Sequence, residues 1–132
     1  MLTGGCQCGD VRYEATGEPY NCTVCHCAMC RRSAGAPFVA WFSVKESEFR
    51  IVSGALTLYE SSENAGRGFC ARCGTSLVYR NAYAGDEIDV TTASLDNPEA
   101  AAPKDHVFVE SRLSWVRLDD ALPQYRRARS EG

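Results

Sequence analysis

Cysteine is the residue type whose spacing in this chain could support chemistry. The 132 residues include eight cysteines. They form three groups: Cys6-Gln-Cys8, Cys22-Thr-Val-Cys25-His-Cys27-Ala-Met-Cys30 and Cys70-Ala-Arg-Cys73. Closely spaced thiolates are typical ligands of zinc and other soft metal ions. Disulfides are disfavoured because close pairs such as Cys-x-Cys strain the geometry of the bridge. The spacing therefore predicts metal sites.

The first predicted site combines the two outer groups. Cys70 and Cys73 are followed by Gly74, so a tight turn can direct both sulfurs at one ion. A structural zinc needs four ligands, and Cys6 and Cys8 lie on one face of an extended segment. We therefore expect a closed structural zinc site of four thiolates, with buried free thiols or disulfides as the alternatives.

The middle group predicts a second, open site. Cys25, Cys27 and Cys30 supply three ligands, and a catalytic zinc keeps three protein ligands and an exchangeable fourth position. Such a site suits a substrate thiol. Arg31 and Arg32 follow directly and are candidate contacts for a substrate carboxylate, or charges that offset the thiolates.

Cys22 leaves an alternative open at this second site. As a fourth ligand it would close the site and leave no position for a substrate. Otherwise it is a packed thiol or a nucleophile near the site. For the two histidines, His26 and His106, the favoured roles are structural or supporting ones rather than metal ligation.

Composition excludes several classes of protein. Apolar residues make up 45% and charged residues 23%, which argues against disorder throughout. No apolar run approaches the roughly 18 residues of a membrane-spanning helix. The formal net charge of −3 argues against a nucleic-acid partner. The first residues do not resemble a secretory signal, so we expect a cytoplasmic protein whose thiols stay reduced.

The pattern of apolar and turn residues predicts a single, mainly β domain. We expect short helical turns after Cys27 and near Leu118–Leu122, and a polar, solvated tail over residues 126–132. The expected strands are Asp10–Thr16, Pro37–Val44, Phe49–Ser53, Leu56–Ser61, Ser76–Arg80, Glu87–Thr92 and His106–Val109.

These motifs together resemble one family. Gly4-Gly5-Cys6-x-Cys8-Gly9, Cys25-His26-Cys27-x2-Cys30-Arg31-Arg32 and Phe69-Cys70-x2-Cys73-Gly74 occur in this order. The set is similar to the glutathione-dependent formaldehyde-activating enzyme (GFA) family, which has a CENP-V/GFA domain. The resemblance covers nearly the whole chain and implies a small zinc-bearing β-tent domain over residues 2–125.

The resemblance also implies roles for the cysteines. In that family the pattern carried here by Cys6, Cys8, Cys70 and Cys73 holds a structural zinc. The pattern carried by Cys25, Cys27 and Cys30 holds a catalytic zinc. The family's named reaction joins glutathione and formaldehyde to give S-hydroxymethylglutathione, which is carbon–sulfur lyase chemistry in the reverse sense.

Two hypotheses about function follow. The first is a carbon–sulfur lyase with two zinc ions per chain, the second of them labile, that handles a small-molecule thiol such as glutathione. The alternative is a zinc-binding module without enzymatic activity, which binds a protein partner or exchanges zinc with thiols. The two differ in whether Cys22 closes the second site. Neither involves nucleic acid or a membrane.

Overall fold

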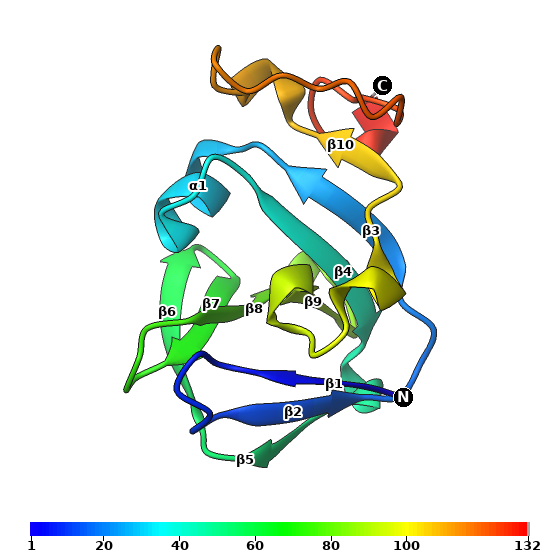
Figure 1. The fold of residues 1–132 in the computed structure, drawn as a ribbon. Coiled ribbons are helices and arrows are strands. Elements are labelled where there is room, and N and C mark those ends of the chain that lie inside the picture. Colours follow the sequence, from blue (N-terminus) through cyan, green and yellow to red (C-terminus); the bar gives the residue numbers. More distant parts are fainter. Residues whose placement is uncertain (132) are drawn as a thin grey trace.

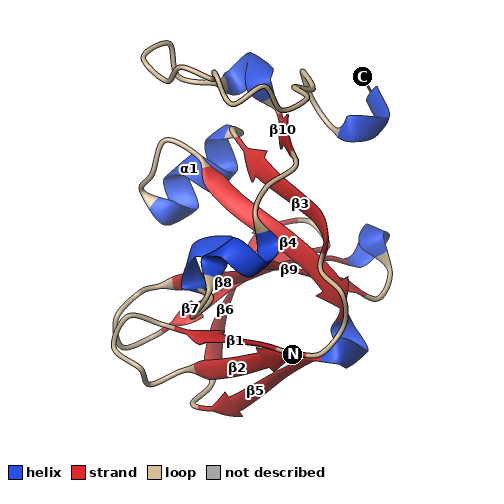
Figure 2. Ribbon diagram, turned by 45° about the vertical axis from the view of Figure 1, so that its right-hand side comes forward, coloured by secondary structure: helices blue, strands red, loops and turns tan. Residues whose placement is uncertain are grey.

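The computed structural model describes residues 1–131 and contains two β-sheets within this range. The smaller sheet has the order β1-β2-β5 and is antiparallel. Its strands are β1 (Leu2–Gly5), β2 (Arg12–Ala15) and β5 (Phe49–Ser53). It lies at the lower end of the molecule in Figures 1 and 2, and β10 with the C-terminal segment lies at the upper end.

The larger sheet has seven strands in the order β10-β3-β4-β9-β8-β7-β6, and its β10–β3 pair is parallel. Its strands are β3 (Tyr20–Cys25), β4 (Val39–Lys45), β6 (Leu56–Ser62), β7 (Ala65–Cys70), β8 (Ser76–Asn81), β9 (Glu87–Thr91) and β10 (Asp105–Val107). The helix α1 (Ala28–Ala34) connects β3 to β4. Short 3₁₀ helices occupy Glu46–Glu48, Ala82–Ala84, Thr92–Ser94, Pro98–Ala101, Val109–Ser111 and Arg129–Glu131. No helix of the described residues is long and apolar enough to cross a membrane.

The main core lies on one face of the larger sheet, because alternate residues of its central strands are apolar. Phe42 and Val44 of β4 stand opposite Val90 and Ile88 of β9, and Val90 also stands opposite Val78 of β8. All five side chains are buried, together with Tyr13 from the smaller sheet. Burial of these side chains holds the two sheets together.

The opposite face of the same strands carries a row of polar and aromatic side chains. Ser43 of β4 stands opposite Asp89 of β9, Asp89 stands opposite Tyr79 of β8, and Tyr79 stands opposite Arg67 of β7. Cross-strand neighbours of this kind lie within contact distance of one another. The strand alternation therefore separates a packed face from a face that can bear chemistry.

Most of the expected elements are present. The prediction of a mainly β, single-domain fold is confirmed, and each of the seven expected strands coincides with an observed one. The helical turn after Cys27 is α1, but Leu118–Leu122 forms no helix, so that prediction was wrong. The sequence analysis missed three strands: β1, β3 and β7.

The C-terminal segment is largely exposed, as expected for a polar tail, but it is also attached to the fold, which the sequence did not indicate. The backbone N–H of Phe108 donates to the carbonyl of Arg127 at 3.1 Å. The Arg129 guanidinium forms an ion pair with Asp105, whose side chain is largely buried. The segment stays in place because it satisfies backbone and charged groups next to β10. Gly132, the last residue of the expected tail, lies outside the described residues.

Asp89 gives a pH-dependent prediction for stability. Burial raises its pKa to about 6, although the Ser43 hydroxyl donates a hydrogen bond to the carboxylate at 2.6 Å. The folded chain thus binds this proton more tightly than the unfolded chain does, so ionised Asp89 costs stability as the pH rises through 6. Asp89→Asn should increase the free energy of unfolding by up to about 3 kcal/mol above pH 7.

The gain should shrink steeply as the pH falls from 6 toward 4, since the carboxyl of the folded chain is then protonated, and it should vanish only below the ordinary aspartate pKa of 3.8. Urea unfolding of the variant and the original chain between pH 4 and pH 8 measures this difference. The exposed Asp119→Asn is the matched control and should change stability little at any pH. A gain for Asp89→Asn that does not depend on pH would contradict the explanation.

Candidate metal centres and the adjoining cavity

The first cysteine group joins the two sheets. Cys6 and Cys8 follow β1 of the smaller sheet, whereas Cys70 ends β7 of the larger sheet and Cys73 lies in the turn after it. All four sulfur atoms lie within 4.8 Å of one another. Gly74 adopts the left-handed conformation that this turn requires, with φ of 82°.

Neighbouring groups favour the ionised form of two cysteines of this first group, Cys6 and Cys73, whereas the pKa of Cys8 is raised to about 11. The backbone N–H of Val11 donates to Cys6 Sγ at 3.2 Å. The Cys73 sulfur lies 3.2 Å from the Thr75 hydroxyl, and this hydrogen bond lowers the pKa of Cys73 to about 5. Hydrogen bonds of this kind stabilise a thiolate, which is the form of cysteine that binds metals.

The second group forms where β3 passes into α1. Cys25 ends β3, Cys27 precedes the helix and Cys30 lies in its first turn. Cys27 Sγ accepts the backbone N–H of Cys30 at 3.4 Å, and its pKa is lowered to about 2 by hydrogen bonds from the other two thiols. The same contacts raise the pKa of Cys25. The second and third protons are thus hard to remove unless a cation joins the cluster.

The spacing of the sulfur atoms fits tetrahedral metal coordination. A Zn–S bond of 2.3 Å and a tetrahedral angle place neighbouring sulfurs about 3.8 Å apart. The Cys6–Cys8 and Cys8–Cys70 distances are 3.6 and 3.9 Å, and the Cys25–Cys30 distance is 3.5 Å. These sulfurs are too far apart for disulfide bonds, and all eight cysteines are free. The seven cysteines of the two groups could therefore hold two metal ions.

Cys22 lies outside both groups. Its side chain is buried in the main core, while Cys25 and Cys30 belong to a separate apolar cluster with Trp41. Burial raises the pKa of the Cys22 thiol, so the thiolate form of a metal ligand or nucleophile is disfavoured there. Of the roles that the sequence left open for Cys22, the structure places it as a packed thiol.

A cavity of about 470 Å³ opens beside the second group. Its wall includes all three cysteines of that group together with Trp41 and Phe108. Much of the remaining wall comes from the polar row of the larger sheet, namely Ser43, Asp89, Tyr79 and Arg67, and from the attached C-terminal segment at Ala128 and Arg129, and Glu87 adds a second carboxylate. A small molecule in this cavity would have both sulfur ligands and charged side chains within reach.

The two arginines expected to hold a substrate lie elsewhere. Neither Arg31 nor Arg32 is among the residues that line this cavity. Arg31 Nε donates to the carbonyl of His26 at 3.4 Å. Arg32 is exposed and lines a neighbouring cavity of about 500 Å³, which it shares with Arg67. Arg67 lines both cavities and lies 3.9 Å from Cys30 Sγ, so it is placed for the second role considered for Arg31 and Arg32, that of offsetting the thiolate charge.

The sequence analysis missed Arg67, Tyr79 and Asp89 as site residues. They come from three different strands, and no regular interval along the sequence relates them. Only the register between the paired strands brings them together. Arg67 lies between glycines in Ala-Gly-Arg-Gly, a composition that gives little strand signal. One usable signal was the alternation along β8 and β9, which places polar residues on the face opposite the core.

The two histidines support the second group and do not belong to it. Neutral His26 is fully buried between Cys25 and Cys27, and burial lowers its pKa to about 4. Its Nε2 lies 3.0 Å from His106 Nδ1, and His106 Nε2 lies 2.8 Å from the Asp120 carboxylate. The carboxylate accepts a hydrogen bond from His106 Nε2, and a second hydrogen bond joins the two rings. This chain of hydrogen bonds ties the ligand segment to β10 and the residues after it.

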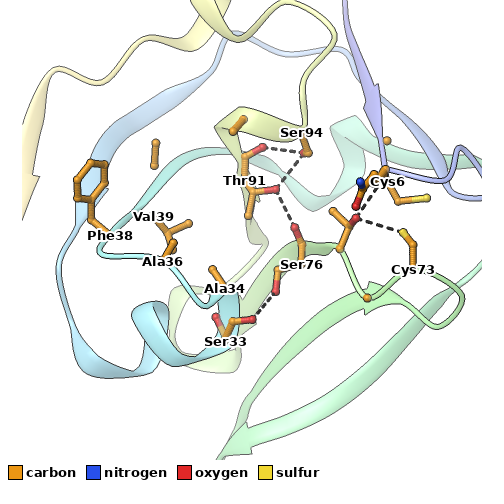
Figure 3. A pocket seen from close by; sticks show the side chains of 16 residues that line it. Cys6, Ser33, Ala34, Ala36, Phe38, Val39, Cys73, Ser76, Thr91 and Ser94 are labelled. Carbon is orange, nitrogen blue, oxygen red and sulfur yellow. Dashed lines mark hydrogen bonds between the residues drawn. The ribbon is translucent and has the colours of Figure 1, made fainter.

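A third cavity, of about 650 Å³, borders the first cysteine group at Cys6 and Cys73. Small and hydroxyl-bearing residues surround it, as Figure 3 shows. The Thr91 hydroxyl contacts Ser94 Oγ and donates to the carbonyl of Ser76, both at 3.0 Å. Among the described residues, its lining includes no lysine, arginine, aspartate or glutamate. The charged groups thus lie beside the second cysteine group and not here.

Comparison with known proteins agrees with this arrangement. A curated protein of Halomonas elongata, named "Putative glutathione-dependent formaldehyde-activating enzyme", is 25% identical over 128 residues, covering 90% of this chain and 82% of that protein. A Schizosaccharomyces pombe protein named as an uncharacterized lyase is 34% identical over 76 residues, covering 58% of this chain and 55% of that one.

A solved structure supports the same conclusion about the fold. The crystal structure of a Rhodobacter sphaeroides protein matches with a TM-score of 0.60 and 25% identity, covering 93% of this chain and 98% of that one. The sequence model of the family described as "Glutathione-dependent formaldehyde-activating enzyme" matches residues 1–111, a range that includes both cysteine groups. The chain therefore belongs to the glutathione-dependent formaldehyde-activating enzyme family.

Proposed function

We propose that this chain is a zinc-dependent carbon–sulfur lyase that acts on a thiol adduct such as S-hydroxymethylglutathione. The observation that carries the proposal is the contrast between the two cysteine groups. The first has four converging sulfurs, which suits a closed structural zinc site at Cys6, Cys8, Cys70 and Cys73. The second has three and adjoins a cavity large enough for a small substrate.

The second group is the proposed catalytic centre. Cys25, Cys27 and Cys30 would hold the zinc, which supplies a Lewis acid that favours the thiolate form of a substrate thiol. Trp41 and Phe108 form apolar parts of the cavity wall and limit the access of water. Because Cys27 is partly exposed while Cys25 and Cys30 are buried, the substrate would approach from the Cys27 side.

Arg32 is the proposed contact for a substrate carboxylate. It lines the neighbouring cavity, where Ser33, Ser61 and Ser76 add hydroxyl groups and no carboxylate is among the described lining residues. A guanidinium in such surroundings suits a carboxylate, which it can bind through two hydrogen bonds. Arg31 is a weaker candidate because its side chain already donates to a backbone carbonyl.

The alternative hypothesis of a closed zinc module has lost its main support. It required Cys22 as a fourth ligand, but this thiol lies in the main core. A site with three ligands remains compatible with the exchange of a labile zinc between this chain and thiols. The activity measurement below distinguishes such exchange from catalysis. We propose the cytoplasm as the location, since thiolate ligands need a reducing compartment.

Metal content tests the ligand assignment. Native mass spectrometry should find two zinc ions per chain. Cys27→Ser should lose one and keep the other, because a hydroxyl is a poor replacement for a thiolate on zinc. The matched control is Cys22→Ser, which should keep both ions although it alters the core. Loss of a zinc in the Cys22 variant with retention of both in the Cys27 variant would reverse the assignment.

Catalysis can be measured without separating the reactants. Glutathione and ¹³C-formaldehyde form the adduct spontaneously, and exchange spectroscopy reports the rate at which its C–S bond forms and breaks. The zinc-loaded chain should accelerate this exchange at least tenfold over buffer, and Cys27→Ser should remove the acceleration. If the folded, two-zinc chain leaves the rate at its uncatalysed value, the lyase proposal fails and zinc–thiol exchange takes its place.

A further inference from the structure

Arg67 is a buried cation in direct contact with the second cysteine group. Its side chain is 9% exposed, and it is the only lysine or arginine among the buried residues of the described chain. Guanidinium Nη2 lies 3.9 Å from Cys30 Sγ, and Nη1 donates to the Ser33 hydroxyl at 3.2 Å. The guanidinium carbon lies 4.7 Å from the centre of the Tyr79 ring.

This cation has no carboxylate partner within residues 1–131. The ion pairs of the described residues all involve other basic side chains. An arginine stays charged at any pH a protein experiences, and a buried charge costs free energy unless an opposite charge compensates it. The group that Arg67 contacts is instead the sulfur cluster, through Cys30, which would supply the compensating negative charge as metal-bound thiolates.

The charges explain why the cluster needs such a partner. Three thiolates and one divalent ion carry a net charge of −1, and a substrate thiolate in the fourth position makes it −2. A double negative charge in a partly buried site is unfavourable because little water is present to screen it. With Arg67 counted, the same assembly carries −1.

We propose that Arg67 is the positioning residue that lets the second cysteine group accept an anionic sulfur ligand. The inference rests on the proposed function, because it assumes that a thiol binds there. On binding, the thiol S–H bond breaks, the proton passes to solvent, and the sulfur takes the open position. Arg67 offsets the added charge without touching the reacting carbon.

Two neighbours hold the guanidinium in this orientation. Tyr79 lies opposite Arg67 in the sheet and presents its ring to the guanidinium plane, and Ser33 of α1 accepts a hydrogen bond from the other side. Cation–π and hydrogen-bond contacts of this kind fix a flexible side chain. Lysine at this position would keep the charge but lose the planar stacking.

Cobalt(II) in place of zinc makes ligand exchange visible, because the absorption spectrum of a cobalt–thiolate site changes when a fourth sulfur binds. The experiment titrates the cobalt-loaded chain and three variants, Arg67→Gln, Arg67→Lys and Arg50→Gln, with 2-mercaptoethanol. This thiol has no carboxylate, so the proposed role of Arg32 does not enter. Arg50 is an exposed arginine on the smaller sheet and provides the matched control.

The original chain and Arg50→Gln should bind the thiol with equal affinity. Arg67→Gln should bind it roughly tenfold more weakly or worse, and Arg67→Lys should recover part of the loss. Cobalt content is measured first: loss from the second site in Arg67→Gln but not in Arg67→Lys also supports a role of charge. Loss in both variants would show that Arg67 acts by packing alone and would overturn the inference.

Two further outcomes separate this inference from the proposed function. If the original chain binds thiol and Arg67→Gln binds it equally well, Arg67 has no such role and the lyase proposal stands. If the spectrum of the original chain does not respond to thiol at all, the open thiol site is wrong, and the role of Arg67 falls with it.

Discussion

This small fold depends on one constraint, the close approach of sulfur atoms that are not bonded to each other. These atoms lie only 3.5 to 3.9 Å apart. Thiolates this close repel one another, and neutral thiols form only weak hydrogen bonds. A divalent cation replaces the repulsion with coordination, which contributes about 10–16 kcal/mol in zinc-binding peptides. That range matches the whole stability of an ordinary domain. A metal ion bound where these sulfurs converge would therefore couple metal binding to folding.

The position of the first group shows what this coupling achieves. It connects the end of β1 to the end of β7, and so links the smaller sheet to the larger one. It adds to the shared apolar core, which includes Tyr13 of the smaller sheet, and to the 2.7 Å hydrogen bond between Tyr13 and Ser94. The second group differs because its ligands all come from one short segment at the start of α1. It can lose its metal without separating two sheets, which agrees with the expectation that the second zinc is the labile one.

The sequence could predict the features that depend on local spacing. Both cysteine groups follow from spacing along the chain, together with the need for four ligands at a structural site, and the two groups converge as expected. Spacing could not predict which side of β3 faces the core, and that choice removes Cys22 from the second group. Nor could it predict the cross-strand row of Ser43, Asp89, Tyr79 and Arg67, because the pairing of distant strands decides which of these residues meet. The missed strand β7, rich in glycine, carries the arginine on which the further inference rests.

The cysteine groups depend on local spacing, whereas the charged residues of the cavity depend on strand pairing, and the two can therefore vary separately among relatives. The motifs on which the resemblance to the family rests are mostly cysteines and glycines in turns and at the start of a helix, and they supply the two cysteine groups. The residues that give the cavity its charge lie on strands, where a substitution changes a side chain without altering the turns. At the 25% identity of the Halomonas elongata protein, the metal scaffold can persist while the cavity wall changes. Membership of the family therefore says more about the two cysteine groups than about the small molecule that would enter the cavity. Arg67 and Asp89 both line the cavity beside the second cysteine group, so a substitution at either position would change the charge of the wall and leave the cysteines in place.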